Sequence, residues 1–163
     1  MPVFRPDSLD RMRAIIDGTR RAGTRGGLPL GNRRSSEWAG GSTSYLDVVP
    51  EQLRVEIGGT WIGRPWWRTA INTEAKLLLR GRAFDNLGAR RVSLKTDAEN
   101  PRSQATIERL GALREGALRA HIVRPDGTAR TTVYFSLLCD EWPAARRRLA
   151  DRLRGNSPGA LSG

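Results

Sequence analysis

The stretch GRPWWRTAINTEAKLLL, at residues 63–79, decides the fold. It begins as a turn and continues as a helix, and the first backbone amides of a helix have no intrahelical acceptor. These amides and the positive end of the helix form a site for an anion. Thr69 and Ala70 are small enough to let a ligand approach the backbone, and Arg68 adds a cation that can reach phosphate oxygens. The stretch therefore fits a diphosphate site.

An ordinary helix start, with Asn72 or Thr73 as its capping residue, explains the same spacing. Spacing alone leaves the two interpretations open. The helix itself is predicted by an apolar face and by Gly88, which ends it where a left-handed residue is wanted. The predicted face consists of Ala75, Leu78, Leu79, Ala83 and Leu87.

The segments before residue 63 predict a helix and a pair of strands. Apolar spacing indicates one short helix from Leu9 to Thr19. Residues 20–41 are rich in Gly and Arg, so we expect a loop or at best a frayed edge strand there. Residues 42–49 and 53–62 have the pattern of two strands joined by a turn at residues 50–52. They predict an antiparallel pair.

The segments after the central helix predict a strand, a helix, a hairpin and a last helix. Residues 90–98 form the strand, and Asn100 followed by Pro101 is typical of a capped helix start. Two strands, at residues 117–123 and 129–138, then flank the turn Arg-Pro-Asp-Gly at residues 124–127, which is favourable hairpin chemistry. A basic amphipathic helix and a Gly/Ser/Pro tail follow. This order predicts an α/β (α+β) fold in which a mixed sheet carries helices on its faces.

Composition narrows the class of protein. A length of 163 residues suits one domain, and no stretch has the length of a membrane helix or of a secretory signal. We therefore expect a soluble, cytoplasmic protein without a membrane partner. Cys139 is the only cysteine and has no His or Cys neighbour at metal-ligand spacing, so disulfide and metal scaffolds are excluded.

The formal charge of +11 raises the alternative of nucleic-acid binding. Much of the excess lies at the ends, since residues 1–37 hold eight Arg against four acids and residues 141–163 hold five against two. Of the 28 basic residues 26 are Arg, which a compositional bias of the genome explains as well as phosphate binding does. We favour a solvated basic surface over a nucleic-acid site.

Three stretches together resemble the GNAT N-acetyltransferases, specifically the branch that acetylates ribosomal-protein amino termini and related amines. They are residues 63–79, residues 89–112 (ARRVSLKTDAENPRSQATIERLGA) and residues 121–143 (HIVRPDGTARTTVYFSLLCDEWP). The resemblance covers residues 41–143. It implies a mostly antiparallel sheet splayed in the middle, with acetyl-CoA in the splay, no metal, and direct transfer to an amine in a ternary complex.

The resemblance also implies which residues contact acetyl-CoA. The pyrophosphate loop of the family falls on residues 67–72, where Trp67 replaces a usual Gln or Arg and Ala70 replaces a usual Gly. If that position requires a positive φ, Ala70 is strained and the affinity for the cofactor is reduced. Asn100 has the expected position of a contact to the pantetheine or phosphate arm, besides its role as a cap. The full set is Trp61, Ile62, Trp67, Arg68, Thr69, Ala70, Ile71, Asn72, Thr73 and Asn100.

Acyl transfer to an amine requires a base for the ammonium and an acid for the departing thiolate. The resemblance places the acid at Ser103, for which an exposed residue near the helix cap is the alternative. Glu56 alternates with Val55 and Ile57 on a strand, so it is a candidate base, although a Glu on a strand more often points to solvent. Tyr134 is a second candidate acid, or a packing residue. His121 is more simply explained as a structural residue.

The amino-terminal third departs from the family. The first strand of the family has no counterpart, and the next falls on Leu28–Asn32, which contains Pro and Gly and would leave a poorly protected edge. We divide the chain into a degenerate amino-terminal part at 1–41, an acetyltransferase core at 42–143, and a basic helix with its tail at 144–163. The expected partners are acetyl-CoA and an amine, either a peptide amino terminus or a small molecule, bound by a monomer or homodimer. A catalytically impaired relative that still binds CoA is the alternative.

Overall fold

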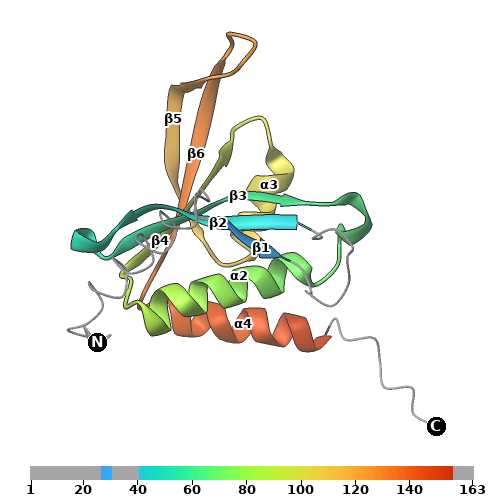
Figure 1. The fold of residues 1–163 in the computed structure, drawn as a ribbon, viewed down its shortest axis with the longest axis vertical. Coiled ribbons are helices and arrows are strands. Elements are labelled where there is room, and N and C mark those ends of the chain that lie inside the picture. Colours follow the sequence, from blue (N-terminus) through green and yellow to red (C-terminus); the bar gives the residue numbers. More distant parts are fainter. Residues whose placement is uncertain (1–26, 31–40, 156–163) are drawn as a thin grey trace.

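The computed structural model describes residues 27–30 and 41–155, and Figure 1 shows its ribbon. Within these residues six strands form one sheet in the order β1-β2-β3-β4-β6-β5. The strands are β1 Gly27–Leu30, β2 Gly41–Val49, β3 Arg54–Ile62, β4 Arg91–Asp97, β5 Leu113–Val123 and β6 Ala129–Leu138. The α-helices of the described part are α2 Ile71–Gly81, α3 Pro101–Arg109 and α4 Trp142–Gly155. The mixed sheet with flanking helices is the predicted architecture.

The sheet is splayed between β3 and β4. These two strands run parallel, and their register ends at the pair Glu56 and Ser93. All the other neighbouring strands pair antiparallel. Beyond Glu56 and Ser93, therefore, each strand has an edge toward the other that no described strand covers, and the two diverge toward α2 and α3 (Figure 1). The predicted splay is present.

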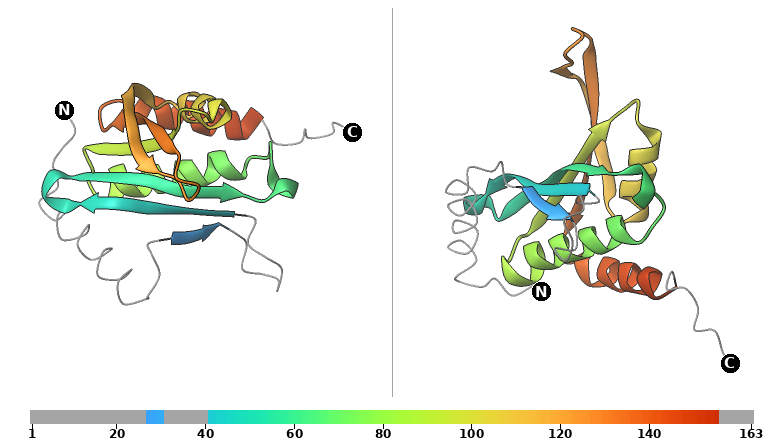
Figure 2. Two further views of the ribbon diagram at one scale, coloured as in Figure 1. Left: turned by 90° about the horizontal axis from the view of Figure 1, so that it is seen from above. Right: turned by 45° about the vertical axis from the view of Figure 1, so that its right-hand side comes forward.

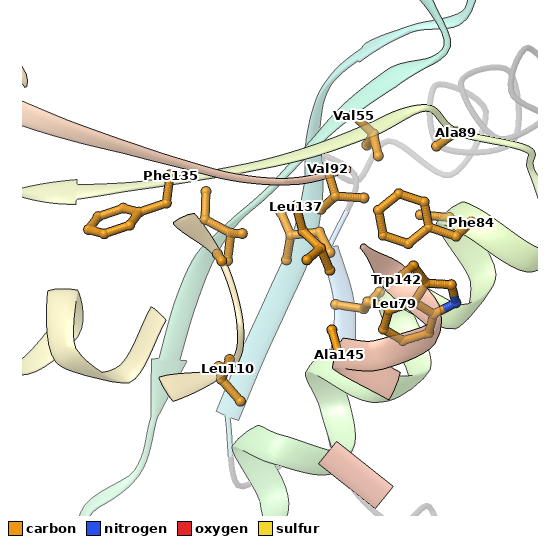
Figure 3. Packing of buried hydrophobic residues seen from close by; sticks show 14 of the residues in the cluster. Val55, Leu79, Phe84, Ala89, Val92, Leu110, Phe135, Leu137, Trp142 and Ala145 are labelled. Atoms are coloured by element: carbon orange, nitrogen blue, oxygen red, sulfur yellow. The ribbon is translucent and has the colours of Figure 1, made fainter. Parts of the chain in front are cut away.

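One face of the sheet packs on all three α-helices. Alternate residues of the central strands, such as Val92 on β4 and Leu137 on β6, are buried there. Phe84 and Trp142 stack with ring centroids 5.4 Å apart, and the Trp142 indole N–H donates to Asp85 at 2.9 Å. Figure 3 shows this core, and Figure 2 shows from above how the helices lie along one side of the sheet. The helix α4, which contributes Trp142, is thus part of the core.

The opposite face of the central strands is polar. Alternation along β3, β4 and β6 brings five polar side chains to it, and we call this set the polar face. It consists of Glu56, Ser93, Lys95, Tyr134 and Ser136.

The central helix differs from its predicted face. Leu78 is 65% exposed, whereas Lys76 and Arg80 are buried beside Leu79. Including Leu78 in the apolar face was therefore wrong, because the buried stripe is rotated toward two basic side chains, Lys76 and Arg80, each of which donates at least one hydrogen bond. The segment Arg82–Asn86 continues the helix in π geometry, and Gly88 follows with a φ of 67°. The predicted left-handed end at Gly88 is confirmed.

The other predicted elements are largely confirmed. Asn100 caps α3 by accepting from the Ser103 amide at 2.9 Å, and Gly111 ends it with a φ of 90°. The strand β5 begins at Leu113, before the predicted start at residue 117. The edge strand predicted at Leu28–Asn32 appears as Gly27–Leu30, paired with β2. Three predicted segments lie outside the described residues. They are the helix at residues 9–19, the last two residues of the predicted edge strand at 31–32, and the carboxyl-terminal tail.

None of the helices in the described ranges combines the length and the apolar content that crossing a bilayer requires.

Candidate functional site

The turn between β3 and α2 is built from a short 3₁₀ segment, Arg64–Trp66, and the four residues 67–70 after it. Trp67 is extended, and Arg68 reverses the chain with a φ of 63°. The Thr69 hydroxyl donates to the carbonyl of Trp66 at 2.8 Å, which fixes the turn internally. The residue that takes the left-handed conformation is therefore Arg68.

The predicted strain at Ala70 is wrong. Ala70 is the residue before α2 and has a φ of −68°, which any L-residue adopts without cost. No side chain caps the helix, so the alternative of Asn72 or Thr73 as the capping residue is also wrong. The Ala70 carbonyl accepts from Glu74 at 2.9 Å, as the first turn of a helix requires. Ala70 therefore gives no reason to expect a weakened cofactor site.

The start of α2 has open hydrogen-bonding groups. The Ile71 amide has only a long contact of 3.4 Å to the Thr69 hydroxyl, and the amides of Asn72 and Thr73 find no acceptor among the described residues. The Asn72 side-chain oxygen is buried and also lacks a partner within that part of the chain. Two free N–H groups at a helix start attract an anion, since the helix dipole adds to their partial charge.

Trp67 contacts both sides of the splay, namely the end of β3 and the start of α3. Its indole N–H donates to the Ile62 carbonyl at 2.7 Å, at the end of β3. The guanidinium carbon of Arg102, on the first turn of α3, lies 4.3 Å from the centroid of the indole ring, and that of Arg64 lies 5.7 Å away. These are cation–π distances. An aromatic side chain thus holds the start of α3 near the turn, at the position where the resemblance implies a polar residue.

The other predicted cofactor residues lie around this opening. Asn100 uses its oxygen for the cap, which leaves its amide N–H groups for a ligand. Ser103 is half-buried one turn into α3, and its hydroxyl bonds to no described residue. Trp61, near the end of β3, is 57% exposed. The structure thus gathers the turn and the start of α3, while Trp61 extends into solvent.

The Glu56 carboxylate lies at the apex of the splay. It belongs to the last residue of β3 that pairs with β4, and only 4% of the residue is exposed. One oxygen is 3.1 Å from the Lys95 amine, and the other has no partner among the described residues. The expectation that a Glu on this strand points to solvent is wrong. A buried carboxylate with one free oxygen is a suitable proton acceptor, since its partner cation balances the negative charge.

Tyr134 lies next to Lys95, and His121 lies next to Tyr134. The Lys95 amine lies 5.8 Å from the centre of the Tyr134 ring, and the His121 ring meets that ring edge-on at 5.8 Å. Glu56, Lys95 and Tyr134 therefore come together on the polar face. Ser103 lies on α3, at the other side of the sheet, so the two candidate acids belong to different parts of the site.

Sequence reasoning missed Lys95 and Arg102. Alternation places Lys95 on the same face of β4 as Ser93, but only the long-range pairing of Ser93 with Glu56 makes this the face of Glu56. Arg102 carries no such signal, because its stacking on Trp67 depends on how far β3 and β4 diverge. No cluster of three or more His, Cys, Asp or Glu side chains that could hold a metal ion is present in the described residues.

The chain is similar to known proteins in sequence and in fold. The sequence model of the family "Acetyltransferase (GNAT) domain" matches residues 3–113. The Bacillus subtilis (strain 168) protein named "Putative ribosomal N-acetyltransferase YdaF" is 31% identical over 140 residues, which are 84% of this chain and 74% of that protein.

Solved structures with a related sequence share the fold. A T. thermophilus protein described as a "putative acetyltransferase" is 40% identical with a TM-score of 0.72, and the match covers 86% of this chain and 73% of the other. A GCN5-related N-acetyltransferase from Brucella melitensis is 33% identical with a TM-score of 0.71, covering 76% of this chain and 56% of the other.

Proposed function

The chain belongs to the GNAT acetyltransferase family, and on that premise we propose that it transfers an acetyl group from acetyl-CoA to a primary amine. The observation that carries the proposal is the splay after Glu56 and Ser93. It leaves the backbone edge of β3 open beside the free amides at the start of α2. A cosubstrate with amide groups and a diphosphate matches both features, since amides pair with a strand edge and phosphates bind a helix start.

The residues of the turn would hold the diphosphate. The Asn72 and Thr73 amides are its donors, and Arg68, whose side chain is exposed, adds a positive charge. Asn100 and Arg102 lie on the opposite side of the splay, at the start of α3. Through its indole, Trp67 holds the end of β3 and the start of α3 together, at the position where the resemblance implies a polar residue.

The proton transfers use groups near the point where β3 and β4 separate. The thioester of acetyl-CoA supplies the acyl group, and its carbonyl carbon is attacked by a neutral amine while the carbon–sulfur bond breaks. Glu56 accepts the ammonium proton, directly or through water, and Lys95 balances the charge of the carboxylate. The thiolate takes a proton from Ser103 or Tyr134, and that hydroxyl regains a proton from the nitrogen of the newly formed amide, so the one proton released overall is the one on Glu56. Tyr134 shares the polar face with Glu56, and Ser103 lies beside Arg102 on α3.

The acceptor belongs to one of two classes, peptide amino termini or small amines. A B. subtilis relative is named for ribosomal N-acetylation, which favours a peptide amino terminus. Turnover is measured as release of free CoA thiol against a panel of amino-terminal peptides and of small amines. We expect release with at least one peptide. Binding of acetyl-CoA without release with any amine would instead indicate an impaired CoA-binding relative.

A further inference from the structure

The helix α2 buries two basic side chains that the proposed reaction does not use. Only 4% of Lys76 and none of Arg80 is exposed, and neither forms an ion pair within the described residues. Arg80 donates to the Leu110 carbonyl at the end of α3 at 2.5 Å. Its counter-charge is therefore the negative end of a helix dipole. The Lys76 amine is instead stabilised by hydrogen bonds to hydroxyl groups.

The Lys76 amine closes a triangle of hydrogen bonds with two threonines. It donates to the hydroxyl of Thr43 on β2 at 2.7 Å and to that of Thr60 on β3 at 2.6 Å. The two hydroxyl oxygens are 2.9 Å apart. One side chain of α2 thus fastens the helix to both strands of the β2–β3 pair, at the end of β3 that leads into the turn.

Thr60 can reach Lys76 only because β3 contains a bulge. The pairs Ser44 with Gly58 and Ser42 with Trp61 leave two residues of β3 opposite the single residue Thr43. The first of the two is Gly59, with a φ of 59°, as such bulges often require.

The bulge changes which face Thr60 occupies. Ile57 lies in the core beneath α2, so regular alternation would direct Gly59 toward α2 and Thr60 away from it. The extra residue reverses this and brings the Thr60 hydroxyl to the amine. The hydrogen bond from Lys76 therefore selects the bulged register over the regular one.

The selected register matters for the free edge of β3. Beyond Glu56 this edge faces the splay, so one extra residue shifts which backbone groups of residues 59–62 point into it. We propose that Lys76 is a positioning residue for the cofactor: through Thr43 and Thr60 it holds the bulge of β3 against α2, and so aligns the strand edge with the turn. The proposal rests on the proposed function, because it assumes that acetyl-CoA occupies the splay.

The test compares variants that remove one hydrogen bond each. Lys76→Met keeps the aliphatic stem without the amine, Thr60→Val removes the hydroxyl, and Thr60→Ser restores it. Thr132→Val is the control, since Thr132 is another threonine of the sheet, fully buried where Thr60 is exposed, and its hydroxyl has no partner in the described residues. The measurements are the Kd for acetyl-CoA by calorimetry, the KM for each substrate, and amide hydrogen exchange at residues 59–62.

We expect Lys76→Met and Thr60→Val to weaken acetyl-CoA binding by roughly ten- to hundredfold, as small misplacements at a site do. The KM for the amine should not change, and exchange at residues 59–62 should accelerate relative to β4 and β6. Thr60→Ser should bind within about twofold of wild type, and Thr132→Val should bind unchanged. If Lys76→Met does not fold, the Val and Ser variants of Thr60 decide alone.

Two negative results have different meanings. If the wild type binds acetyl-CoA and Thr60→Val binds it equally well, the positioning role is overturned and the proposed function stands. A lower melting temperature with unchanged affinity would likewise overturn the positioning role. If the wild type does not bind acetyl-CoA at all, the proposed function fails and the positioning role fails with it.

Discussion

At the scale of single residues, Glu56 combines burial with incomplete pairing. A buried carboxylate usually satisfies both oxygens, yet here Lys95 takes one and the described residues leave the other free. A proton acceptor requires this combination, because its partner balances the charge while the free oxygen receives the proton. The carboxylate also lies where β3 and β4 separate.

Replacing Glu56 by Gln should lower kcat by about 10²- to 10⁴-fold, since proton transfer by a positioned base contributes that much. The Kd for acetyl-CoA should change little, because the carboxylate lies away from the diphosphate turn. Glu115→Gln is the control: Glu115 also pairs with a cation, Arg91, but on the exposed edge strand β5. A Glu56→Gln variant with wild-type kcat would contradict the role.

Arg68 combines a strained backbone with a cation, and two variants separate these features. Gly adopts a positive φ without cost, whereas Ala retains the strain, so Arg68→Gly should be more stable than Arg68→Ala by about 1 kcal/mol. Both should lose affinity for acetyl-CoA, since both remove the charge. Urea denaturation and calorimetry measure the two effects. Equal stability of the two variants would show that the turn does not impose this conformation.

At the scale of elements, the sequence predicts most of the order of strands and helices, because turn residues and apolar spacing are local signals. Gly88 and Asn100 have the conformation and the cap that their positions predict. The buried face of α2 was not predictable in this way, since Lys76 and Arg80 look like surface residues until Thr60 and Leu110 are brought to them. Tertiary partners override the local pattern there.

The same limit applies to the site. The turn before α2 follows from its own sequence, but the choice of the left-handed residue does not: Ala70 was the residue considered for a positive φ, and Arg68 is the residue that has one. The ion pair between Glu56 and Lys95 needs the register of two strands that are distant in sequence. Long-range pairing of this kind is invisible to spacing within one segment.

The bulge of β3 should depend on the backbone freedom of Gly59. An added Cβ there would meet only the Ser44 hydroxyl at 3.8 Å, so the cost of Gly59→Ala is conformational and not steric. We expect a loss of about 1–2 kcal/mol in the free energy of unfolding. Gly116→Ala on β5 is the control, because its Cβ would meet nothing and its φ is ordinary. If both variants unfold at the same urea concentration, the bulge is not a constrained element.

At the scale of the whole molecule, the buried Lys76 couples stability to pH. Burial, and to a smaller extent the charge of Arg80, lowers the pKa of the Lys76 amine to about 7. From β2, Tyr45 also faces α2, and burial raises its pKa, so it stays neutral. Thr43 and Thr60 contribute only hydroxyls. The amine therefore releases its proton on folding at alkaline pH.

Between pH 7 and 10.5 the unfolded chain binds one proton more at Lys76 than the folded chain does. The free energy of unfolding should thus rise with pH through this window, by about 1.4 kcal/mol per unit from this group. Below pH 7 both states are protonated and the gain is absent. Denaturation at pH 7, 8 and 9 should show a steeper rise for the wild type than for Lys76→Met. Parallel curves would contradict the assignment.

The central claim is that the splay between β3 and β4, with the turn before α2, binds acetyl-CoA. Isothermal titration of the whole chain with acetyl-CoA tests it most directly. We predict saturable binding of one acetyl-CoA per chain, weakened in Arg68→Ala, which removes a cation of the turn. A titration that produces no binding heat, with no thermal shift at any acetyl-CoA concentration, would contradict the account.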